Sequence, residues 1–205
     1  MKHPSNRELH DYWNERRGSR LAPERADIEP SAIRQVLGDT FVLATDAMGH
    51  YPFRLAGTRL CALFSRELKN ESFVKLWERS GQTAMRELLA VVMEEKTGVV
   101  ASVTASTADD SILAVNLELL LLPLSHESRS EARVLGALAP MAAPYWLGAK
   151  AVGPAQARHA PPHRRGGRSD AGPAFCRRSR PAPGWPGGIP GWPEGLRTLT
   201  HRNGV

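Results

Sequence analysis

The sequence is poor in cysteine, with only Cys61 and Cys176 among 205 residues. Two distant cysteines indicate neither a disulfide framework nor a zinc site. No apolar run reaches the roughly 18 residues that a membrane-spanning helix needs, and Asn116 and Glu118 interrupt the most hydrophobic segment, LAVNLELLLLPL. The first residues, MKHPSNRELHDYW, lack the apolar stretch of a signal peptide. We therefore expect a cytoplasmic protein without a membrane span.

Motifs with a known chemistry are also missing. The sequence has no HExxH, no CxxC, no glycine-rich phosphate loop and no GxSxG. Asp109 and Asp110 form a carboxylate pair, but adjacent acidic residues in a turn usually only face solvent. We therefore expect no enzymatic activity, no catalytic residues, no metal and no cofactor.

The last 55 residues differ in composition from the rest. Residues 151–205 contain ten Gly, nine Pro and nine Arg, against one Asp and one Glu. They show neither a helix period nor a strand period, so they lack an apolar face to offset the entropy of ordering. We predict a disordered tail over residues 148–205. Three origins stay open for it: a basic arm that binds nucleic acid or an acidic partner, a solvated extension, and out-of-frame translation of GC-rich DNA.

The first 150 residues, by contrast, are nearly neutral and periodic. They carry 18 basic and 19 acidic side chains, so nothing in this body indicates a nucleic-acid surface. The clearest helix, over 82–95, has apolar residues at helical spacing at Met85, Leu88, Leu89, Val92 and Met93. Shorter helices are predicted over 7–17, 30–37 and 59–64. Strands are predicted over 41–45, 51–55, 98–107, 111–125 and 132–141.

Gly57 stands where the second predicted strand meets the third helix, in FRLAGTRLCALF. We predict that Gly57 adopts a backbone conformation that a Cβ would resist. We also predict that the Thr58 hydroxyl caps the helix that follows.

Two strands, a set of helices and three further strands form the element order of a PAS domain. Residues 9 to about 147 resemble a family of small bacterial PAS-like sensory and regulatory proteins. The resemblance rests on YWNERRGSRLAPERADIEP, FRLAGTRL and SFVKLW. It implies an α+β fold with a five-stranded antiparallel sheet and helices on one face. The expected organisation is an N-terminal helical extension over 1–37, a PAS-like domain over 38–147 and the tail over 148–205.

The resemblance also implies a signalling module that works through other molecules. A haem ligand is not expected, because the 82–95 helix has neither His nor Cys, and Cys61 lacks the Asn-Cys-Arg context of flavin photosensors. An uncharged small ligand in the core stays open, as does a carrier or enzyme role for such a pocket. The preferred interpretation is that the same side chains fill the core without a void. The candidate lining is Phe53, Leu55, Leu63, Phe73, Leu76, Leu89, Met93, Val103 and Leu117.

Protein–protein interaction or dimerisation is the expected mode of action. Asn116 and Glu118 alternate with apolar residues, which predicts that they face away from the core, where PAS sheets often pair with a second subunit. Helix 7–17 packs either on its own domain or on a partner's sheet. The interface candidates are Leu9, Tyr12, Trp13, Asn116 and Glu118. A charged cluster consists of Arg17, Arg20, Arg25, Asp27 and Glu29. It predicts surface ion pairs, with a docking site for an anionic ligand or for a partner's acidic patch as the alternative.

Overall fold

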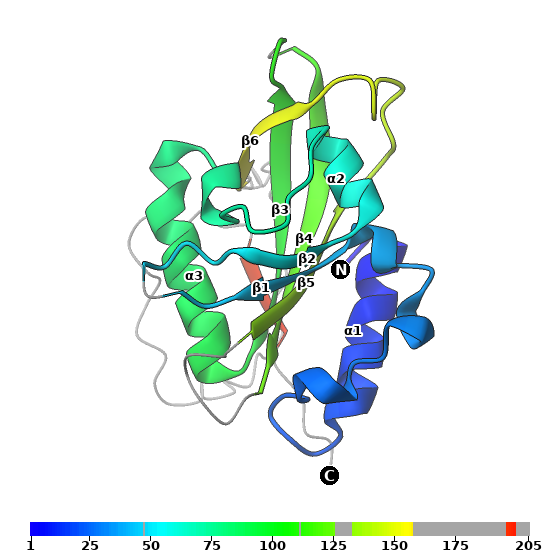
Figure 1. The fold of residues 1–205 in the computed structure, drawn as a ribbon, viewed down its shortest axis with the longest axis vertical. Helices are drawn as coiled ribbons and strands as arrows, with labels where there is room; N and C mark the ends of the chain where they lie inside the picture. Colours follow the sequence, from blue (N-terminus) through cyan, green and yellow to red (C-terminus); the bar gives the residue numbers. More distant parts are fainter. Residues whose placement is uncertain (47, 111, 126–132, 158–195, 200–205) are drawn as a thin grey trace, which may run out of the picture.

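A single antiparallel sheet organises the protein, with helices on both of its faces (Figure 1). The computed structural model describes residues 1–46, 48–110, 112–125, 133–157 and 196–199. Its α-helices are α1 (Pro4–Arg17), α2 (Thr58–Phe64) and α3 (Gln82–Glu95). Its strands are β1 (Thr40–Ala44), β2 (Phe53–Ala56), β3 (Gly98–Thr107), β4 (Ala114–Leu124), β5 (Arg133–Pro140), β6 (Val152–Ala157) and β7 (Leu196–Leu199).

The sheet order is β2-β1-β5-β4-β3-β6, and β7 also pairs with β3. Every pair of neighbouring strands is antiparallel, so the predicted α+β class and the five predicted strands are confirmed. The sheet has more strands than expected because β6 and β7 add to it. None of the helices in the described residues is both long and apolar enough to cross a lipid bilayer.

β6 lies inside the segment that the sequence analysis assigns to a disordered tail. Residues 152–157 pair with β3, and the side chains of Val152 and Ala155 are buried. The composition does not predict this short strand, because Gly153 and Pro154 are both residue types that disfavour strands. Residues 158–195 and 200–205 of the predicted tail lie outside the described residues.

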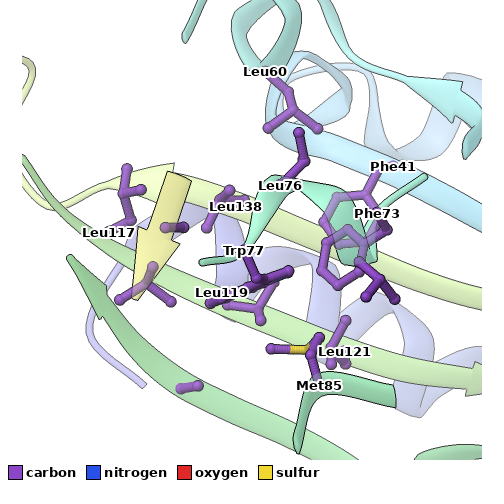
Figure 2. Close-up of a cluster of buried hydrophobic side chains, with 14 of the residues drawn as sticks. Phe41, Leu60, Phe73, Leu76, Trp77, Met85, Leu117, Leu119, Leu121 and Leu138 are labelled. Atoms are coloured by element: carbon purple, nitrogen blue, oxygen red, sulfur yellow. The ribbon is translucent and has the colours of Figure 1, made fainter. Parts of the chain in front are cut away.

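The inner face of the sheet packs against α2, α3 and the 3₁₀ helix Val74–Leu76. Alternate residues of β4 point into this inner core, including Leu117, Leu119 and Leu121 (Figure 2). Phe41, Phe53, Phe73 and Trp77 form its aromatic centre, with Phe41 and Phe73 ring centroids 5.3 Å apart. Edge-to-face and tilted ring pairs of this kind add to the stability from burial.

The outer face of the sheet packs against α1 and the chain that follows it. The other residues of β4, including Leu120, Leu122 and Leu124, contact Leu9 and Trp13 of α1 in a second cluster. The run LLLL in β4 is therefore buried on both faces. The segment predicted as a helix over 30–37 is instead two 3₁₀ helices, Pro30–Ile33 and Leu37–Asp39; a third, Arg25–Asp27, precedes them. Ile33 and Val36 are buried against this face, as their spacing predicts.

Other backbone contacts the free sides of the edge strands β2 and β6. Phe53 N donates to Glu71 O at 3.0 Å and Asn70 N donates to Phe53 O at 2.8 Å, which covers the free side of β2. Glu78 N donates to Ala155 O at 3.1 Å on the free side of β6. Covered edges disfavour pairing with a strand of another chain. β2 and β6 are therefore poor candidates for an interaction surface.

Gly57 is the N-cap of α2, and its backbone dihedrals, φ −69° and ψ 157°, are ordinary extended values. The predicted unusual conformation is therefore wrong. The predicted cap is wrong as well, because Thr58 is the first helical residue and α2 has no side-chain cap.

Candidate functional site

The nine core-pocket candidates divide between the core and the surface. Seven of them are buried in the inner core: Phe53, Leu63, Phe73, Leu76, Leu89, Val103 and Leu117. Met93 is partly buried at the margin of this core.

Leu55 does not belong to the inner core, because its side chain is 38% exposed. A bulge shifts the pairing of β1 with β2 between Val42 and Leu43, so Leu43 pairs with Phe53 and Val42 with Leu55. Leu55 then faces the same side as Val42, which belongs to the outer cluster. A one-residue shift of this kind moves a side chain to the opposite face.

Trp77 places one unsatisfied polar group inside the inner core. Its side chain is only 3% exposed, and its indole Nε1 has no hydrogen-bond partner among the described residues. The ring lies between Leu138, Leu119 and Phe73 in Figure 2. A buried donor without a hydrogen-bond partner lowers the stability of the fold, so most buried donors in proteins have a partner.

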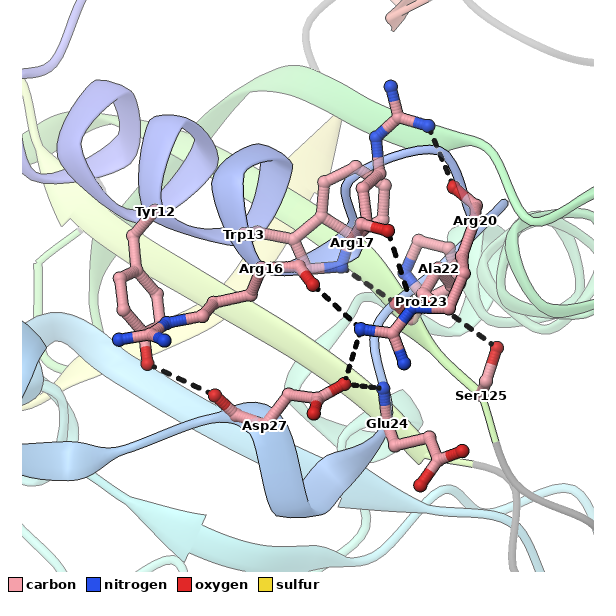
Figure 3. Close-up of polar contacts among 10 residues, drawn as sticks. All are labelled: Tyr12, Trp13, Arg16, Arg17, Arg20, Ala22, Glu24, Asp27, Pro123 and Ser125. Atoms are coloured by element: carbon pink, nitrogen blue, oxygen red, sulfur yellow. Dashed lines mark hydrogen bonds and ion pairs between the residues drawn. The ribbon is translucent and has the colours of Figure 1, made fainter.

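The outer face holds most of the interface candidates, and the chain itself already covers them. Leu9, Trp13 and Glu118 are 0%, 5% and 6% exposed, so of the two predicted alternatives Leu9 and Trp13 follow the one in which the helix packs on its own domain. Trp13 Nε1 donates to Pro123 O of β4 at 2.9 Å (Figure 3). Tyr12 is half-buried, and its hydroxyl accepts from Glu29 N at 2.8 Å. Asn116 is the one candidate of the five that stays fully exposed.

Glu118 faces away from the inner core as predicted, but the start of the chain binds it. Its carboxylate accepts from Lys2 N at 2.7 Å, from His3 N at 2.9 Å and from Asn6 Nδ2 at 3.2 Å. Asn6 Nδ2 also donates to Glu118 O at 3.0 Å. This buried carboxylate therefore fixes the entry into α1 on the outer face.

The charged cluster after α1 is likewise used within the chain. Arg20 pairs with Asp27 at 2.7 Å, and Arg17 Nη1 donates to Arg20 O (Figure 3). Arg25 Nη1 donates to Ile28 O. The backbone N–H of Glu24, followed by Arg20, lowers the pKa of Asp27 below its ordinary value. The carboxylate is therefore the form that favours folding, and this contribution is lost as pH falls through the lowered pKa. These contacts favour the ion-pair interpretation over an anion-docking site.

A groove with a volume of about 420 Å³ lies where the starts of α1 and α2 meet the end of β5. Its polar lining is His3, Ser5, Asp39 and Arg59. Its apolar lining is Leu63, Leu138, Pro140, Met141, Ala142, Ala143 and Leu147. Of the nine core-pocket candidates only Leu63 lines this groove.

Asp39 and Arg59 form the polar end of the groove. Arg59 Nε and Nη2 donate to the two Asp39 carboxylate oxygens at 2.8 and 2.9 Å. Ser5 Oγ donates to Asp39 Oδ2 at 2.8 Å. The hydrogen bond to Asp39 raises the pKa of Arg59 above its ordinary value. Sequence reasoning missed this pair because the two residues lie 20 positions apart and belong to no motif.

Three large apolar side chains are exposed at the same end of the sheet. Ile112, Tyr145 and Met141 are 86%, 91% and 41% exposed. Hydrogen bonds from Ala108 N to Ala151 O and from Met141 N to Asn116 O hold the β3–β4 turn beside the β5–β6 connection. The described residues include no group of three or more His, Cys, Asp or Glu side chains that could hold a metal ion.

A family model described as a PAS domain matches residues 1–139, which include α1 and every strand from β1 to β4. No curated protein matches the chain.

Proposed function

Because the chain belongs to the PAS domain family, we propose that it is a cytoplasmic, non-enzymatic module that regulates by protein–protein interaction, chiefly with a second copy of itself. A signal would then act by shifting the balance between associated and free forms. A signalling protein of another kind is the alternative partner.

The exposure of Ile112, Met141 and Tyr145 at one end of the sheet is the observation that carries this proposal. Exposed apolar and aromatic side chains that gather in one region are typical of interaction sites. The other surfaces are less suitable, because α1 covers much of the outer face and other backbone contacts the free sides of β2 and β6.

We expect the full chain to form a dimer. In the double variant Ile112→Ser/Tyr145→Ser, the dissociation constant of this dimer should rise about tenfold or more, because a central aromatic residue is often an interface hot spot. Light scattering after size-exclusion chromatography, over a range of concentrations, measures this. Leu21→Ser is the matched control, because Leu21 is also exposed, at 71%, but lies at the other end of β4. Its neighbour Pro23 accepts a hydrogen bond through its carbonyl oxygen from Ser125 N, just after β4 ends. A monomer at every concentration, or a double variant that dimerises normally, would contradict the proposal.

A second candidate function is that of a carrier for an uncharged molecule in the inner core. The unsatisfied Nε1 of Trp77 favours it, because a ligand with an acceptor atom would complete the hydrogen bonding there. We expect native mass spectrometry of the full chain to detect a bound small molecule, and Trp77→Phe to lose it. Absence of any bound mass from the wild-type protein would remove the support for this function.

A further inference from the structure

The polar end of the groove presents hydrogen-bond donors toward its interior. His3 Nδ1 accepts from Ser5 N at 3.2 Å, as the N-cap of α1, so the neutral imidazole carries its proton on Nε2. Arg59 uses Nε and Nη2 for Asp39, and Nη2 also donates to Gln35 O at 3.0 Å. Arg59 Nη1 has no hydrogen bond to any of the described residues, which leaves its two N–H groups available.

Arg59 is the more exposed member of its pair with Asp39. Three donors occupy the Asp39 carboxylate, whose side chain is only 6% exposed, whereas the Arg59 side chain is 55% exposed. Both residues line the groove, and the guanidinium is the member of the pair with free donors. Such a donor set complements a carboxylate better than a neutral group, because charge-assisted hydrogen bonds are the stronger ones.

The rest of the groove is apolar. Leu63 from α2, Leu138 from β5 and Leu147 from the β5–β6 connection lie along it. Its volume falls within the range of about 300–1,000 Å³ typical of small-molecule sites, which combine apolar walls with a few polar groups.

We propose that this groove binds a small monocarboxylate with a compact apolar body, the carboxylate on Arg59 and His3 and the body against Leu63, Leu138 and Leu147. The groove borders the inner core, with which it shares Leu63 and Leu138. Ile112 and Tyr145, which are proposed for dimerisation, do not line it, although Met141 borders both the groove and that surface.

The test uses the full chain with 4-phenylbutyrate as probe and its uncharged amide, 4-phenylbutyramide, as matched control. An NMR titration measures both dissociation constants. We expect the carboxylate to bind about tenfold tighter or more, as the loss of a charged hydrogen-bond partner implies. Equal affinity of the two compounds, or no binding of the carboxylate, would overturn the proposal.

Two variants locate the binding. Ala143→Phe fills the groove from an exposed position and should abolish binding. Ala149→Phe is its control and should leave binding unchanged, because it adds the same ring at an exposed position of the same connection outside the groove lining. His3→Asn keeps a side-chain acceptor at the N-cap but removes the Nε2 donor, so it should weaken binding of the carboxylate. Undiminished binding by Ala143→Phe would also overturn the proposal.

Discussion

Replacement of Gly57 by alanine should lower the free energy of unfolding by about 3 kcal/mol or more, at the upper end of the cost of overpacking. An added Cβ would lie 2.1 Å from Leu37 O, 2.3 Å from Gly38 O and 2.5 Å from Gly38 C. All three are backbone atoms, so no side chain can rotate away to make room. Chemical denaturation measures the loss.

The backbone around Gly57 cannot move aside either. Gly57 N donates to Thr40 O at 2.8 Å, and Gly57 O accepts from Cys61 N at 2.9 Å. The first bond holds the end of β2 against β1, and the second closes the first turn of α2. A shift that relieved the overlap would therefore break one element or the other.

Gly81→Ala is the matched control for this variant. A Cβ at Gly81 would meet no atom within 4 Å, and its φ of −95° suits any residue. We expect a change within about 0.5 kcal/mol, as for surface substitutions. A loss below about 1 kcal/mol for Gly57→Ala would contradict the close packing of these two backbone segments.

The inner half of the fold could be predicted from the sequence because its signals are local. Met85, Leu88, Leu89 and Val92 are buried in α3 as their spacing predicts, and the confirmed family follows from motifs that stand in continuous stretches. Gly57 shows the limit of such reasoning. The need for glycine could be predicted, but its cause is contact with Leu37 and Gly38, which lie about 20 residues earlier in the chain.

The rest could not be predicted because it depends on contacts between distant segments. Leu55 is turned outward by a bulge that leaves no mark in the alternation of FRLA. The groove joins His3, Asp39 and Arg59, whose residue types are ordinary at each position. Period-2 alternation correctly turns Glu118 away from the core, but it carries no information on the partner that covers it.

The outer face leads to a second large effect, at Trp13. Trp13→Ala should cost about 3–5 kcal/mol, the usual range for a buried tryptophan. The variant removes a ring that is 5% exposed and the hydrogen bond to Pro123 O, and it uncovers leucines of β4. Trp13→Phe keeps most of the packing and should cost mainly the hydrogen bond, about 1 kcal/mol.

The manner of unfolding distinguishes an integral α1 from a separable extension. Leu120, Leu122 and Leu124 belong to the central part of the sheet, and they would face water if α1 left. Undocking of α1 should therefore destabilise the whole sheet. We expect Trp13→Ala to unfold in a single cooperative transition at lower denaturant concentration than the wild type. We also expect the variant to show faster hydrogen exchange in α1 and β4 together. An early transition confined to α1, with the main transition unchanged, would show instead that residues 1–37 are an extension that the sheet does not need.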